Sequence, residues 1–100
     1  MAIDENHFRI ISSAATRERD KHHIKKHLNK DIKLIDVTDD YCVFGLFGPK
    51  SRSLISILSN DNFDNENFKF GTAKFISIED IKIWTQRLSY VGELGYELYV

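Results

Sequence analysis

Arg87-Leu88-Ser89-Tyr90-Val91-Gly92-Glu93-Leu94-Gly95-Tyr96-Glu97-Leu98-Tyr99-Val100 is the stretch that decides the fold of this chain. Two glycines, Gly92 and Gly95, interrupt a run of aromatic and branched residues. Glycine adopts positive φ angles without a steric penalty, so the pattern predicts a bend between two extended segments. Tyr90 before the bend and Glu97 after it would then face one another at the mouth of a pocket. A tyrosine offers a flat apolar ring, and a carboxylate accepts paired N–H donors from a planar heterocycle.

The same stretch, R-x-S-Y-V-G-E-L-G-Y-E-L in one-letter code, resembles the signature of the glycine-cleavage T-protein (aminomethyltransferase) superfamily, which binds tetrahydrofolate. Its Val-Gly-Glu-Leu-Gly form is most similar to the branch fused to FAD-dependent dimethylglycine and sarcosine dehydrogenases. Three further stretches agree with the resemblance in the family's order, and together they span nearly the whole chain: Phe8–Ala15, Asp36–Tyr41 and Leu46–Arg52.

The resemblance implies that Tyr90 and Glu97 line a tetrahydrofolate site, where Glu97 would accept the adjacent N–H donors of the pterin edge. Glu93, which lies within the bend, is interpreted as a turn-stabilising residue. In the intact parent protein, a one-carbon unit would pass from an N-methyl or aminomethyl donor to tetrahydrofolate. In the dehydrogenase branch, FAD would be held by another domain that this chain does not contain.

Two departures from the family pattern indicate an internal piece of a several-fold longer protein, or a truncated open reading frame that starts at Met1. The family's catalytic aspartate precedes the strand matched by Phe8–Ala14, and Asp4 lies too close to Phe8 to replace it. The family's C-terminal region, with an arginine that helps to form the pocket, is also missing. We therefore expect residues 1–100 to be a single partial folate-binding domain with no catalytic residue, inactive by itself.

Composition narrows the possible functions. The 100 residues are 42% hydrophobic with a net charge of −1, which suits one domain and argues against nucleic acid or an anionic membrane as a partner. We find no secretory signal and no apolar run of roughly 18 residues, so we expect a cytoplasmic protein. Cys42, the single cysteine, excludes an internal disulfide and a cysteine-rich metal site, and we interpret it as a buried space-filling residue.

Local patterns predict an α+β fold with a mainly antiparallel sheet and helices on one face. Its first elements follow the ferredoxin-like β-α-β-β-α-β order, with additional C-terminal strands. Apolar Tyr41–Phe47 is predicted to be an interior strand that pairs with Ile32–Val37 as a hairpin. The remaining predicted elements are strands at Phe8–Ala14, Ala73–Ile78 and Ile81–Tyr90, helices at Thr16–Leu28 and Ser51–Ser59, and a loop at Asn60–Asn67 whose end Phe68 and Phe70 anchor to the core.

Several features suggest more specific chemistry, but each has a simpler interpretation that we prefer. Residues 17–30 hold six Lys or Arg against two acidic residues, a net charge of +4, which we interpret as a solvated helix face. His23 and His27 are spaced for a shared metal ion, but no third ligand is evident, so we predict no metal site. Trp84 is interpreted as a core residue rather than as a residue that lines a binding site.

An alternative function comes from the incomplete sheet. A sheet with open edges can accept a further strand, so the chain could be a small interaction or assembly module without catalysis. Such a module would dimerise, or pair with missing segments of the parent, through its exposed strand edges.

Overall fold

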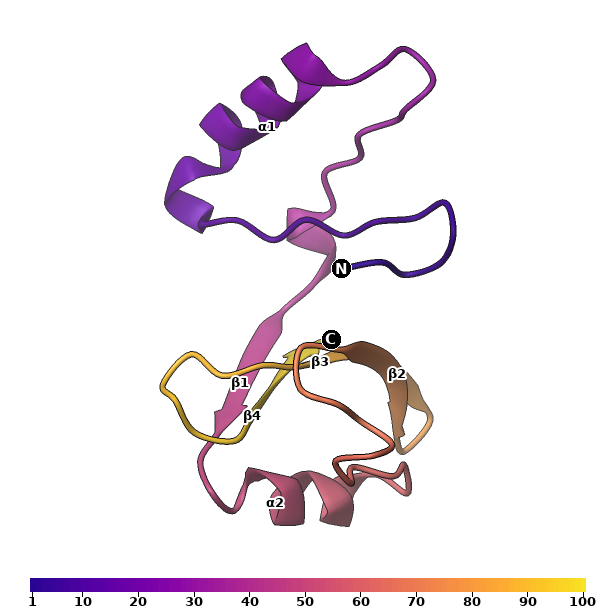
Figure 1. Ribbon diagram of the computed structural model, residues 1–100, viewed down its shortest axis with the longest axis vertical. Coiled ribbons are helices and arrows are strands. Elements are labelled where there is room, and N and C mark those ends of the chain that lie inside the picture. The colour runs from indigo at the N-terminus through magenta and orange to yellow at the C-terminus, as the bar shows by residue number, and fades with distance from the viewer. The chain divides into compact units, whose positions relative to one another are not determined.

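The computed structural model describes all 100 residues as two compact units, Met1–Thr38 and Asp39–Val100. Figure 1 shows one helix in the first unit, and a helix with a small sheet in the second. This combination confirms the predicted α+β class, while the assignment of residues 1–100 to a single domain stays a prediction. The helices are α1 (Arg17–His27) and α2 (Ser51–Leu58), and the strands are β1 (Val43–Phe47), β2 (Ala73–Ile78), β3 (Ile81–Arg87) and β4 (Gly95–Tyr99).

The sheet of the second unit is antiparallel throughout, in the order β1-β4-β3-β2. β2 and β3 form the predicted hairpin, in which Ile78 pairs with Ile81 across the two-residue turn Glu79-Asp80. β4 lies between β1 and β3, so the motif at residues 87–100 supplies a central strand. The predicted bend before it is confirmed, with Gly92 at a φ of 80°.

The hydrophobic core lies on the face of the sheet that α2 covers (Figure 1). α2 contributes Ile55, which is completely buried. The loop between α2 and β2 adds Phe63 and Phe68, whose rings contact the Tyr96 ring at centroid distances of 5.8 and 5.7 Å. The buried cluster comprises Ile55, Phe63, Phe68, Ile76, Ile83 and Tyr96.

Two predicted strands are absent from the structure. Phe8–Ala14 makes only an isolated bridge between Phe8 and Ala2, and Ile32–Val37 forms no strand. Both segments are rich in branched residues, but Ile10 and Ile32 are 64% and 56% exposed and no neighbouring strand pairs with either segment. The predicted hairpin with Tyr41–Phe47 is therefore wrong, and the ferredoxin-like order is not confirmed.

Three smaller predictions about the second unit are also wrong. β1 is an edge strand rather than an interior one, because β4 pairs with it on one side only. Cys42, just before β1, is exposed rather than buried. Phe68 anchors the loop as predicted, but Phe70 is 69% exposed, because the chain turns after Phe68 and carries the second ring away from the core.

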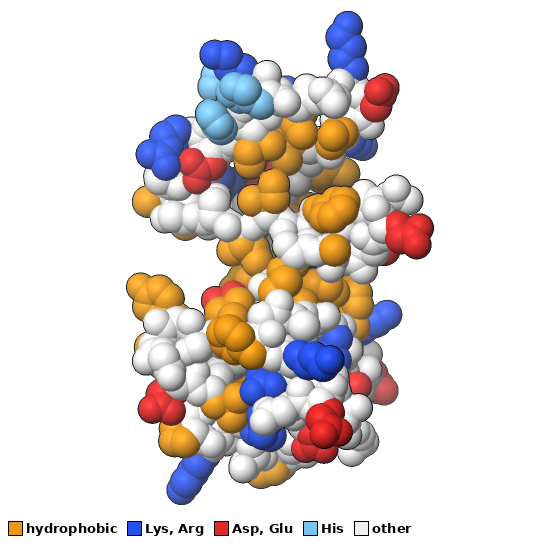
Figure 2. Space-filling view, in the orientation of Figure 1, with side chains coloured by type: hydrophobic (Ala, Val, Ile, Leu, Met, Phe, Trp, Pro, Cys, Tyr) orange, Lys and Arg blue, Asp and Glu red, His pale blue; other side chains and the backbone are white.

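The first unit contains α1, as predicted, without a buried residue along the helix. Lysine, arginine and histidine side chains gather over this helix in Figure 2. Asp36 links the following segment to the helix: its Oδ2 accepts hydrogen bonds from Arg17 Nε at 3.0 Å and from Lys21 Nζ at 3.2 Å. These charge-assisted bonds hold the pKa of Asp36 well below its ordinary value, Arg17 making the largest contribution.

No helix in the structure has the length and apolar character needed to cross a membrane.

Candidate functional site

Glu97 occupies the middle of β4, directly opposite Gly45 on β1 and Gln86 on β3. Side chains that are directly opposed across an antiparallel pair lie on the same face of a sheet, and residues two apart on a strand share that face. Glu97 therefore lies on the face opposite to the one that α2 covers. We call this surface the Glu97 face and define it by Trp84, Gln86, Glu97 and Tyr99.

The Glu97 carboxylate is half-buried and held by a neighbour on its own strand. Tyr99 donates a hydrogen bond of 2.7 Å from its hydroxyl group to Oε2 of Glu97. Tyr99 and its cross-strand partner Trp84 are only 6% and 4% exposed. A carboxylate with aromatic neighbours and one fixed hydroxyl donor is well suited to accept N–H groups from a flat ligand.

Gln86 adds a hydrogen-bond donor beside this carboxylate. The residue is 1% exposed, and its Nε2 has no hydrogen-bond partner in the structure. Buried amide groups in folded proteins are nearly always paired, so an unpaired one on the Glu97 face fits a role in binding a ligand. Gln86 and Tyr99 are not among the site residues predicted from the sequence. Strand alternation could have placed Tyr99 beside Glu97 and Gln86 beside Trp84, whereas the relation between these two pairs depends on the register between β3 and β4.

Trp84 was predicted to be a core residue, and its burial is confirmed. Its ring packs edge-on against Phe75 of β2, with a centroid distance of 4.9 Å and an interplanar angle of 69°. It does not belong to the apolar cluster beneath α2, because it lies on the Glu97 face. Trp84 is thus buried on the side of the sheet that carries Glu97, outside the core cluster.

Tyr90, the other predicted folate residue, lies in the connection between β3 and β4 and is 87% exposed. No hydrogen bond or ring contact joins it to Glu97 in this structure. Glu93 lies in the same connection, close to the bend at Gly92, and is also exposed. The joint role of Tyr90 and Glu97 in a folate site stays a prediction.

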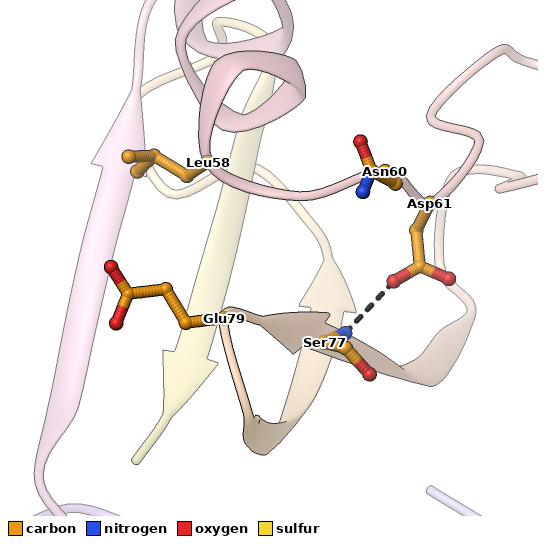
Figure 3. A pocket seen from close by; sticks show the side chains of 5 residues that line it. All are labelled: Leu58, Asn60, Asp61, Ser77 and Glu79. Carbon is orange, nitrogen blue, oxygen red and sulfur yellow. Dashed lines mark hydrogen bonds between the residues drawn. The ribbon is translucent and has the colours of Figure 1, made fainter.

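A shallow hollow of about 340 Å³ lies elsewhere on the second unit, lined by Leu58, Asn60, Asp61, Ser77 and Glu79 (Figure 3). Its aspartate already has a structural role, because Asp61 Oδ2 accepts a hydrogen bond of 2.8 Å from the backbone N–H of Ser77. No three His, Cys, Asp or Glu side chains gather into a possible metal site anywhere in the chain. The Glu97 face is therefore the strongest candidate for a functional site.

These features define an α+β domain with a half-buried carboxylate on a central strand. The chain belongs to the GCVT N-terminal domain family, whose model matches residues 1–100. This result confirms the resemblance that the sequence motifs indicated.

Three of the individual relatives are named as the following enzymes. The chain is 38% identical over 69 residues to mitochondrial dimethylglycine dehydrogenase from Mus musculus, covering 69% of this chain and 8% of that protein. It is 31% identical over 93 residues to 4-methylaminobutanoate oxidase (formaldehyde-forming) from Paenarthrobacter nicotinovorans, covering 92% of this chain and 11% of that protein. An aminomethyltransferase from Halothermothrix orenii is 28% identical, with 98% of this chain and 27% of that protein covered. The chain therefore spans about a quarter or less of each of these relatives.

Proposed function

We propose that this chain is part of a T-protein-like domain that binds tetrahydrofolate and, in its parent protein, takes part in one-carbon transfer to that cofactor. The observation that carries the proposal is Glu97, a half-buried carboxylate fixed by Tyr99 on a central strand of a domain of this family. Bound tetrahydrofolate would supply the nitrogen atoms that accept the one-carbon unit. The donor would be an N-methyl or aminomethyl compound, as the names of the relatives suggest.

The residues of the Glu97 face fit a pterin ring chemically. A pterin presents adjacent N–H donors on one edge, which the Glu97 carboxylate can accept, and a carbonyl oxygen, to which Gln86 Nε2 can donate. Trp84 and Tyr99 supply apolar ring surface beside these polar groups. Tyr90 would add a further ring when the connection that carries it lies against the ligand.

We expect this chain by itself to bind without catalysing the transfer, because no residue of it matches the catalytic aspartate implied by the resemblance. FAD chemistry of the dehydrogenase type would belong to another domain of the parent. The predictions that the protein is cytoplasmic and has no nucleic-acid or membrane partner are kept as part of this proposal.

A titration of folinic acid, a stable reduced folate, into the purified chain tests the proposal by calorimetry. We expect binding by the wild-type chain and a loss of roughly ten- to a hundredfold in affinity for Glu97→Ala, the usual effect of removing a charged hydrogen-bond partner. Glu93→Ala is the matched control, because it removes an exposed carboxylate from the neighbouring connection. The folate proposal fails if the wild-type chain does not bind, or if the two variants bind equally well.

Gln86→Leu keeps the approximate volume of this side chain and removes the unpaired donor. We expect weaker folinic acid binding with an unchanged or increased free energy of unfolding, because the substitution removes a buried polar group that has no partner in the unliganded protein. Weaker binding together with a clear loss of stability would indicate that Gln86 supports the fold instead.

A further inference from the structure

The two ends of α1 differ in how they are held. At the N-terminal end, Arg17 and Lys21 donate hydrogen bonds to the Asp36 carboxylate. The last turn is basic, and α1 buries no side chain along its length. Helices in proteins gain most of their stability from packing an apolar face, so the C-terminal end of α1 gains little from its surroundings.

His23 and His27 lie one turn apart in this C-terminal half, and histidine side chains gather at the surface over α1 in Figure 2. Both residues are exposed, with ring centroids 4.5 Å apart and an interplanar angle of 40°. A zinc ion binds imidazole nitrogen at about 2.0–2.1 Å in tetrahedral geometry, which places the centres of two bound rings about 5 Å apart. The two rings therefore already have nearly the separation that a shared metal ion requires.

A hydrogen bond orients the second of these rings. Nδ1 of His27 lies 2.8 Å from the backbone carbonyl oxygen of His23. Because a carbonyl oxygen only accepts hydrogen bonds, Nδ1 carries the ring hydrogen, and Nε2 keeps the lone pair that can bind a metal ion. Metal-binding histidines usually donate their other ring N–H to a carbonyl or carboxylate oxygen in this way.

The charges around the pair both oppose and favour a cation. Residues 17–30 carry a net charge of +4, which repels one. Arg19, one turn before His23, is paired with Asp20 at 3.1 Å, so its charge is compensated. His27 is the last residue of α1, and the C-terminal end of a helix attracts positive charge because its carbonyl groups point outward. The pair therefore lies at the end of the helix that favours a cation.

We propose that His23 and His27 bind one late divalent transition-metal ion, such as Zn²⁺, which bridges the last turn of α1. Imidazole nitrogen suits this class of ion, and residues four apart lie on one face of a helix. No third His, Cys, Asp or Glu joins the pair, and Asp20, one turn earlier, accepts hydrogen bonds from Thr16 and Arg19. The lack of a third ligand led to the prediction of no metal site from the sequence, but water can complete the coordination of such an ion.

A titration of Zn²⁺ into the chain, followed by NMR of its histidine side chains, tests the proposal. We expect saturable shifts at His23 and His27, together with stronger helical chemical shifts for residues 21–27 as the last turn is bridged. Mg²⁺, which prefers oxygen ligands, should change neither. His23→Gln and His27→Gln should each lower the Zn²⁺ affinity roughly tenfold or more, because one ligand is lost.

His22→Gln is the matched control, because adjacent residues of a helix do not face one another. It should keep a Zn²⁺ affinity within about threefold of the wild type. His23→Gln leaves the bond between the His27 ring and the backbone of residue 23 in place, so its loss of affinity reports a lost ligand rather than a disturbed helix.

The absence of saturable Zn²⁺ binding, an equal loss of affinity in His22→Gln, or binding that leaves the helical shifts unchanged would each overturn the proposal. No folate is present in this titration, so this proposal and the folate proposal can fail separately.

Discussion

The ring of Phe47 lies across Gly95, its direct partner on β4, and also covers Gly45 on its own strand. A β-carbon at either glycine would collide with this ring. At Gly95 it would also lie 2.9 Å from the backbone carbonyl oxygen of Leu88, whereas at Gly45 the close neighbours all belong to the Phe47 side chain. A side chain can move aside, but the backbone at Leu88 cannot do so without disturbing the start of the connection to β4.

The two glycines should therefore differ in their tolerance of alanine. We expect Gly95→Ala to lower the free energy of unfolding by about 1–3 kcal/mol, the usual cost of adding a group to a filled site. Gly45→Ala should cost less than about 1 kcal/mol, because only the mobile end of Phe47 must shift. Urea denaturation of the two single variants measures the difference.

Phe47→Leu provides the control for this explanation. In that background the cost of Gly45→Ala should fall, since the ring that it meets is gone, while most of the cost of Gly95→Ala should persist because the Leu88 carbonyl remains. Equal costs for the two alanine substitutions in the wild-type background would contradict the role assigned to Leu88.

Phe68 and Phe70 form a second matched pair, with nearly opposite environments. Phe68 is 1% exposed and contacts the rings of Phe63 and Tyr96, whereas Phe70 is 69% exposed. We expect Phe68→Ala to lower the free energy of unfolding by about 3–5 kcal/mol, and Phe70→Ala to change it by less than about 0.5 kcal/mol. Thermal denaturation followed by Trp84 fluorescence measures both. A large effect at Phe70 would mean that its ring is buried in the folded protein in solution.

Much of the second unit could be predicted because its elements carry local signals. α2 follows a Gly-Pro break and repeats apolar residues at helical spacing, and β2 and β3 are branched strands joined by a short polar turn. The two missing strands carry equally branched residues, at Phe8–Ala14 and Ile32–Val37. A strand needs a neighbour to satisfy its backbone hydrogen bonds, and the sequence of one segment does not say whether a neighbour exists.

The candidate site was predictable only in part for a similar reason. Glu97 was found through its motif, but its neighbours Gln86 and Tyr99 were not. The relation of Glu97 to Gln86 depends on the register between β3 and β4, which the length and shape of the connection at residues 88–94 determine. Tyr99 could have been placed beside Glu97 from strand periodicity alone, because the two are separated by one residue.

We expect the first unit to lose stability at acid pH, because Asp36 has a lowered pKa and loses its charge there. The carboxylate accepts hydrogen bonds from Arg17, Lys21 and Thr38, so its pKa in the folded protein lies below its ordinary value of 3.8. A carboxyl group whose pKa is lower in the folded chain than in the unfolded chain stabilises the fold fully at pH values above its unfolded pKa. This stabilisation is lost as the pH falls through the folded pKa. We therefore expect α1 to keep its helical NMR chemical shifts from pH 7 to about pH 5 and to lose them progressively below about pH 4.

Asp36→Asn separates this carboxylate from the other acidic groups of the unit. Asp4 and Asp20 also have lowered pKa values, Asp4 mainly through the backbone N–H of Asn6 and Asp20 mainly through the Thr16 hydroxyl group, so some acid sensitivity should remain. The variant loses the charge that attracts Arg17 and Lys21, and residues 17–27 should therefore already show weaker helical shifts at pH 7. They should then change less on acidification than those of the wild-type chain. An acid titration identical to that of the wild type would show that the link between Asp36 and α1 does not stabilise the helix.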